Sequence, residues 1–128
     1  MTRSKLLLSA SALFFGLAGA GATFLPHELL AHVRQPDAPI LAVFIQALGA
    51  LYLAFAMLNW MSRGATIGGI YGRPLVVANF LYFLMTGIVL VRWAAAGAPP
   101  GILVLAAIHA NFAIWFGSVM FGSPKPRT

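Results

Sequence analysis

The stretch APILAVFIQALGALYLAFAMLNWMS, residues 38–62, contains no charged side chain and decides the fold class of this chain. A helix that crosses a bilayer needs about 20 consecutive, mainly apolar residues, and this stretch exceeds that length. The rest of the chain has the same character: 61% of its 128 residues are hydrophobic, only 8% are charged, and the mean hydropathy is +0.91. Because a soluble domain carries roughly a quarter charged residues, acyl chains rather than water are expected to cover this protein.

Three further apolar windows appear when the sequence is cut at its charged residues, and Pro99 and Pro100 break the last of them. The expected spans are residues 6–25, 39–61, 74–92 and 102–121. Helices satisfy their own backbone groups in hydrocarbon, and short connections make successive helices antiparallel neighbours. We therefore predict an all-α membrane protein, a four-transmembrane-helix up-down antiparallel bundle that forms one domain over residues 1–128.

The start of the chain also fits a different interpretation. MTRSKLLLSASALFFGLAGAGA has the basic start, apolar middle and small-residue end of a secretory signal peptide. Cleavage near Ala22 would leave three spans, with the new terminus outside. The uncut run is long enough to span and three other helices offer it a packing surface, so we expect the first span to be retained.

The net charge of +6 comes from isolated cations that form no basic patch with interleaved aromatic residues, so nucleic acid is not an expected partner. Lys and Arg concentrate on the cytoplasmic side of membrane proteins with short loops. Six of the eight lie at the amino terminus, in the second connection and in the tail, and two lie in the first and third connections. This predicts that both termini are cytoplasmic and that Arg63 and Arg73 anchor lipid head groups. The chain has no cysteine, which excludes disulfides and thiol chemistry.

Small residues at helical spacing predict the packing faces, because close backbone approach drives helix association in lipid. The expected faces are Ala12, Gly16 and Ala20 in the first span, Ala47, Ala50 and Ala54 in the second, and Ala106, Ala110, Ala113 and Gly117 in the fourth.

PHELLAH, Pro26–His32, nearly spells the His-Glu-x-x-His motif of zinc proteases. Its histidines are five residues apart, about 140° around a helix, and cannot close on one ion. The only acids in the chain are Glu28 and Asp37, so we predict no metal site. We expect a short amphipathic turn at the outer interface, with Glu28 and His32 paired at i and i+4. A proton-sensitive or ligand-contacting rim formed by His27, Glu28 and His32 is the open alternative.

Polar residues inside the spans are the other candidates for function. Gln46, Thr86 and His109 are expected at similar depth in the outer half of the membrane, and Asn59, Asn79 and Ser118 in the inner half. They suit interhelical hydrogen bonds. The alternative is a small polar cavity of Gln46, Thr86 and His109, of which a bis-histidine haem site is a special case, with His109 and either His27 or His32 as axial ligands.

The second connection contains Gly68, Gly69 and Gly72 followed by Arg73, but it lacks the Gly-Lys-Ser/Thr of a phosphate-binding loop. Its surroundings, LNWMSRG and GGIYGRPLVVANF, are similar to a group of uncharacterised small four-helix bacterial membrane proteins. The resemblance covers the second span and the start of the third. It implies a four-span bacterial inner-membrane protein, and no activity, substrate or catalytic residue.

These observations predict a protein that is not an enzyme, with no catalytic residue and no cofactor. The expected role is that of an accessory, assembly or stabilising subunit of a membrane complex, which binds the lipid bilayer and either a membrane-protein partner or itself. The alternatives are a small carrier or ligand-binding bundle that acts as a homo-oligomer, and a redox protein that handles haem or quinone.

Overall fold

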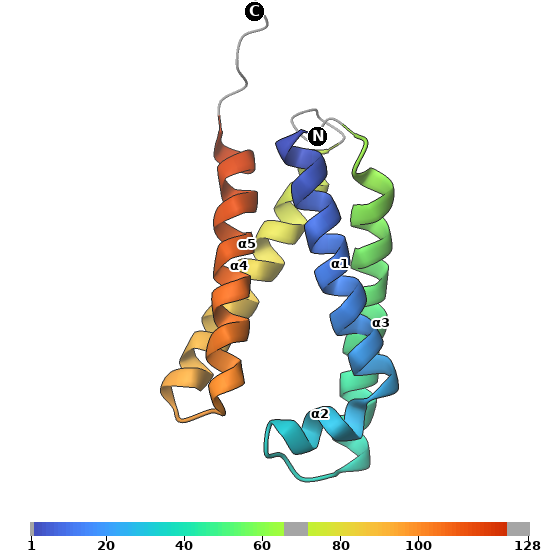
Figure 1. Ribbon diagram of the computed structural model, residues 1–128, viewed down its shortest axis with the longest axis vertical. Helices are drawn as coiled ribbons and strands as arrows, with labels where there is room; N and C mark the ends of the chain where they lie inside the picture. Colours follow the sequence, from blue (N-terminus) through green and yellow to red (C-terminus); the bar gives the residue numbers. More distant parts are fainter. Residues whose placement is uncertain (1, 66–71, 123–128) are drawn as a thin grey trace, which may run out of the picture. The chain divides into compact units, whose positions relative to one another are not determined.

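The computed structural model describes residues 2–65 and 72–122, and every regular element in that part of the chain is a helix (Figure 1). The helices are α1 (Arg3–Phe24), α2 (Pro26–His32), α3 (Pro39–Ser62), α4 (Arg73–Ala95) and α5 (Pro100–Phe121). All but α2 are long and apolar enough to cross a membrane. The predicted all-α fold with four such helices is confirmed, and the chain is a multi-pass membrane protein.

The chain divides into two compact units, Met1–Gly64 and Ala65–Thr128. In the first unit α1 packs along α3, and α2 contacts both helices. In the second unit α4 packs along α5. Each unit is an antiparallel helix pair, as short connections predict. The arrangement of all four helices as one domain stays a prediction.

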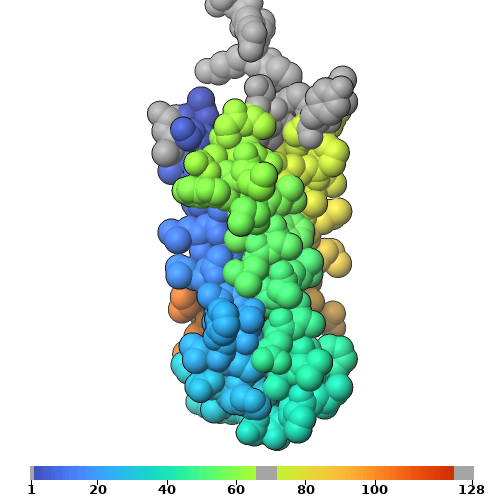
Figure 2. Space-filling model, turned by 90° about the vertical axis from the view of Figure 1, so that its right-hand side faces the viewer, coloured from blue at the N-terminus to red at the C-terminus, as the bar shows by residue number. Residues whose placement is uncertain are grey.

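The first unit is held together where two glycines meet. An ideal Cβ on Gly19 would lie 3.0 Å from the carbonyl oxygen of Gly49, and one on Gly49 would lie 2.8 Å from the backbone nitrogen of Thr23. Any larger side chain at these points would separate the helix backbones. Figure 2 shows α1 (blue) and α3 (green) side by side on one face, with α2 at their end.

The connection between α1 and α3 is shaped by its prolines and by Arg34. Pro26 begins α2 and Pro39 begins α3, positions at which a missing N–H costs no hydrogen bond. Arg34 ends the α2 region in a left-handed conformation (φ 58°), and the N–H of Gln35 then donates to the Leu30 carbonyl at 2.9 Å. PHELLAH is thus a helix of seven residues, in agreement with the predicted helical turn.

The second unit is packed through aromatic rings. Phe83 on α4 stacks on Phe112 and Phe116 of α5, with ring centroids 4.7 Å and 5.8 Å apart. Gly97, with φ 94°, lies two residues after the end of α4 at Ala95, and Pro100 begins α5. The last helix therefore starts two residues before the predicted span, because proline is tolerated in a first helical turn.

Two of the predicted small-residue faces lie only partly at helix contacts. In α1 the buried glycine is Gly19, while Gly16 and Ala20 are half-buried. In α5, Ala106 and Ala113 are buried, Gly117 is half-buried and Ala110 is exposed.

The face predicted for α3 is not the one that α1 covers within the first unit. Ala47, Ala50 and Ala54 are all exposed, and the buried residues of this helix are Ala42, Gly49 and Asn59. The spacing of the small residues identified a continuous face, but α1 packs on the other side of the helix, where Gly49 allows the closest approach.

Candidate functional site

The polar groups of the first unit meet between α1 and α3. The Asn59 amide nitrogen donates to the Ser11 hydroxyl at 3.0 Å, and that hydroxyl donates to the Leu8 carbonyl at 3.1 Å. Both side chains are fully buried. An unpaired amide in hydrocarbon would cost several kcal/mol, so this pair fixes the register of the two helices.

His109 on α5 is a buried polar residue at the contact with α4, at 2% exposure. Its Nδ1 lies 2.8 Å from the Leu105 carbonyl oxygen, and its Nε2 lies 3.2 Å from the Tyr82 hydroxyl oxygen. Because a carbonyl only accepts, Nδ1 carries the hydrogen of the neutral imidazole, and Nε2 accepts from the Tyr82 O–H. Phe83 closes the site, with its ring centroid 5.5 Å from that of His109.

This geometry bears directly on the haem hypothesis. Both ring nitrogens of His109 are occupied by hydrogen bonds, so an axial-ligand role would require Nε2 to exchange its Tyr82 partner for iron. The proposed second ligand, His27 or His32, belongs to the other unit. Among the described residues no group of three or more His, Cys, Asp or Glu side chains is placed to hold a metal ion.

The residues of the predicted polar cavity belong to both units. Gln46 lies on α3, and its side-chain nitrogen is 3.4 Å from the Thr23 carbonyl oxygen of α1. Thr86 lies half-buried on α4, and His109 lies on α5. A cavity that joins all three residues stays a prediction.

The residues predicted in the inner half of the membrane, Asn59, Asn79 and Ser118, make two kinds of hydrogen bond. Asn59 bonds across to another helix, as described above. Asn79 and Ser118 each donate to a carbonyl of their own helix, Leu75 at 2.9 Å and Trp115 at 2.7 Å. Asn79 is fully buried, whereas Ser118 is exposed.

At the α2 end of the first unit the structure pairs His27 with Asp37. Nδ1 of His27 lies 2.5 Å from Oδ1 of Asp37, and both side chains are largely exposed. The expected pairing of Glu28 with His32 is not among the ion pairs of the described residues, and both residues are exposed. The three residues of the predicted rim therefore share one short helix, and His27 also ties it to the following loop.

Of the two predicted lipid anchors, Arg63 has a defined environment. Its guanidinium carbon lies 3.6 Å from the Trp60 ring centroid, and one nitrogen donates to the Trp60 carbonyl at 2.8 Å. Arg73 is exposed at the first residue of α4. Gly68 and Gly69 of the second connection, and the tail cations Lys125 and Arg127, lie outside the described residues.

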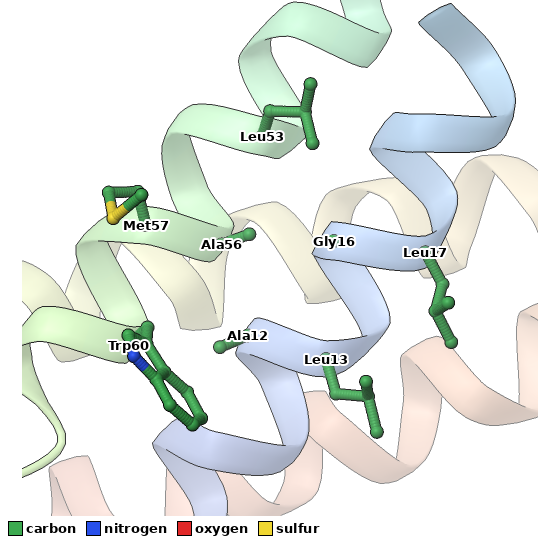
Figure 3. A pocket seen from close by; sticks show the side chains of 8 residues that line it. All are labelled: Ala12, Leu13, Gly16, Leu17, Leu53, Ala56, Met57 and Trp60. Carbon is green, nitrogen blue, oxygen red and sulfur yellow. The ribbon is translucent and has the colours of Figure 1, made fainter. Parts of the chain in front are cut away.

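An apolar groove runs between α1 and α3, and Trp60 is one of the residues that line it (Figure 3). Its floor is made of the small residues Ala12, Gly16 and Ala56, and larger side chains, including Leu13, Met57 and Trp60, stand along its sides. Its volume is about 430 Å³. We call this feature the α1/α3 groove.

Sequence reasoning missed Ser11, Tyr82 and the groove. Because α1 and α3 are antiparallel, Ser11 and Asn59 are at similar depth in the membrane. A search for polar residues at equal depth on neighbouring helices would have found Ser11. Tyr82 is visible in the sequence as a hydroxyl-bearing residue of the third span, but only the contact between α4 and α5 shows that it faces His109. The groove has no sequence signal beyond Ala12 and Gly16, which were assigned to a packing face.

Comparisons with known proteins return no match from protein-family models, curated proteins or solved structures.

Proposed function

We propose that this chain is a small, non-enzymatic accessory subunit of a bacterial inner membrane, and that it assembles with or stabilises a larger membrane complex. The proposal rests on one surface of α3, which carries apolar residues at heptad spacing. Its members are Ile40, Phe44, Ala47, Leu51, Ala54, Leu58 and Met61. All seven are exposed, and we call this surface the α3 seam.

The seam has the features of a helix-packing surface. A repeat of seven residues keeps one face of a helix turned toward a neighbour over its whole length. In the middle of the seam the small Ala47 and Ala54 alternate with the larger Phe44, Leu51 and Leu58. Small residues let helix backbones approach closely in lipid, where large side chains alone gain little over acyl chains. This alternation favours a protein helix as the neighbour of α3.

The polar contacts support a structural rather than a catalytic role. Ser11 and Asn59 bond to each other, and both nitrogens of His109 are engaged by Tyr82 and Leu105. A carrier or redox protein would need polar groups that meet a solute or cofactor. These groups instead join the helices of each pair.

Location and orientation follow from charge and resemblance. The cations Arg3, Lys5 and Arg63 belong to one end of the first unit, where α1 begins and α3 ends, and Arg34 is the single Lys or Arg at the other end. By the positive-inside rule this distribution favours a cytoplasmic amino terminus, and four spans would return the carboxyl terminus to the same side. The bacterial inner membrane is proposed from the resemblance of LNWMSRG and GGIYGRPLVVANF.

The test is site-specific photo-crosslinking in the native membrane. A photoreactive residue at Leu51, on the seam, should give an adduct of defined mass with one other membrane protein or with a second copy. The same residue at Leu103, exposed on α5, is the matched control and should give chiefly lipid adducts.

A second arm uses a change of side-chain volume. Ala54→Leu fills a small position of the seam and should abolish the Leu51 adduct, whereas Ala107→Leu, at an exposed alanine of α5, should leave it unchanged. Adducts with lipid alone at Leu51 would contradict the proposal.

A further inference from the structure

We infer that the α1/α3 groove binds one acyl chain of an anionic phospholipid whose phosphate is held by Arg63. This inference goes beyond the partner proposed for the seam, which lies on another side of α3. It rests on the length of the groove, on the residues that line it and on the charges at its end.

The groove is about as long as part of one acyl chain and much shorter than a membrane-spanning helix. Along α3 it extends from Trp60 to Leu53, and along α1 from Ala12 to Leu17. Seven residues of helix rise roughly 10 Å, which lies within one leaflet of a hydrocarbon core about 30 Å thick. A spanning partner helix would contact the helix pair along its full length. A single chain from one leaflet matches a groove that ends in that leaflet.

The lining suits a flexible hydrocarbon chain. The floor of small residues leaves room between the helices, since a Cβ on Gly16 would lie 3.9 Å from the Ala56 side chain, an ordinary contact distance. Met57 and the leucines at the sides supply apolar contact, and Leu13, Leu17 and Met57 are each more than half exposed. Among the described residues, no charged side chain lines the groove.

The end of the groove supplies complementary charge. Arg63 follows Trp60 by one helical turn, and the Trp60 carbonyl and ring hold its guanidinium group in place. One N–H donor is used in that bond, and a guanidinium has five, arranged to match phosphate oxygens. Arg3 and Lys5 begin α1 at the same end, and neither acid of the chain lies there. An indole at this level is also typical of the head-group region.

The experiment follows the fluorescence of Trp60 in vesicles of phosphatidylcholine and phosphatidylglycerol. Trp93→Phe and Trp115→Phe leave Trp60 as the single indole of the full chain. Bromine atoms on the acyl chains quench a nearby indole, so two matched mixtures are compared, with bromine on the anionic lipid or on the zwitterionic lipid. One arginine near the surface predicts that Arg63 alone contributes about a five-fold preference for phosphatidylglycerol.

Two pairs of variants separate the head group from the chain. Arg63→Gln should remove this five-fold contribution, whereas Arg34→Gln, at the other end of the first unit, should leave the preference unchanged. Gly16→Leu should fill the groove and abolish the preference, whereas Gly21→Leu, where a Cβ meets nothing within 4 Å, should not. Ala56→Leu repeats the groove test if Gly16→Leu fails to fold by circular dichroism.

Three results would overturn the inference. The first is equal quenching by the two brominated lipids. The second is loss of the preference on addition of inorganic phosphate, which would show that the cation acts without the groove. The third is a fall in quenching as the protein-to-lipid ratio rises, which would place a second copy in the groove.

Discussion

Gly49 lies where α3 comes closest to α1, and its replacement by alanine tests the packing of the first unit. The new Cβ would lie 2.6 Å from Oγ1 of Thr23, 2.8 Å from its backbone nitrogen and 3.0 Å from Cβ of Ala22. Non-bonded carbon atoms prefer about 3.5–4.0 Å. Neither a backbone nitrogen nor an alanine Cβ can rotate away, so the helices must separate by roughly 1 Å to restore normal contacts.

The expected cost follows from that overlap. Overpacking of a close contact destabilises by about 1–3 kcal/mol, and alanine returns about 0.5–1 kcal/mol by removing a glycine from a helix interior. Gly16→Ala is the matched control on α1, because its Cβ would meet Ala56 at 3.9 Å and gain the same helix preference without overlap. The two variants should differ in free energy of unfolding by about 1–3 kcal/mol, with Gly49→Ala the less stable.

The assay is unfolding of the purified chain in mixed micelles of dodecylmaltoside and increasing SDS, followed by circular dichroism. Gly49→Ala should unfold at a clearly lower SDS fraction than Gly16→Ala. If the two variants unfold together, the backbones of α1 and α3 do not approach each other at Gly49, and the packing described for this unit is wrong.

Three further predictions concern buried polar groups. Asn59→Ala and Ser11→Ala should each destabilise the first unit, and a double-mutant cycle should give a coupling of about 0.6 kcal/mol, at most about 1.7; a coupling of zero would mean that the two side chains do not bond. Tyr82→Phe should lower stability by about 0.5–1.5 kcal/mol because Nε2 of His109 loses its donor, and the nitrogen-15 chemical shifts of the imidazole should change; unchanged shifts would refute the contact. Thr23→Val should be neutral or stabilising in the same SDS titration, because the Thr23 hydroxyl is buried without a hydrogen-bond partner in the described structure, and a loss above about 1 kcal/mol would show that the hydroxyl has a partner.

The sequence was sufficient to predict the number and approximate position of the long helices, because the solvent imposes that pattern. The uncharged residues 38–62 became α3, Pro39–Ser62. The helix ends were predicted less well. α1 begins at Arg3 instead of residue 6, and Thr2 caps it. A charged residue marks where the hydrocarbon ends, but the helix itself continues beyond that point.

Side-chain partners were harder to predict than helices, because they depend on the register and rotation of one helix against another. Asn59 was recognised as an intramembrane polar residue, but its bond to Ser11 requires the approach of Gly19 to Gly49. Ala47 and Ala54 illustrate the same difficulty. Their spacing defines a face of α3, but more than one face of this helix carries small residues, and Gly49 determines which one α1 covers.

The absence of cysteine permits the most direct test of the claim that this chain crosses a bilayer four times with both ends in the cytoplasm. Single cysteines at Thr2, Gln35, Gly64 and Ala96 would be exposed to a membrane-impermeant maleimide in intact cells and again after lysis. With four crossings and cytoplasmic ends, Gln35→Cys and Ala96→Cys should react in intact cells, and Thr2→Cys and Gly64→Cys should react only after lysis. Labelling of Gln35→Cys and Gly64→Cys from the same side would contradict this topology.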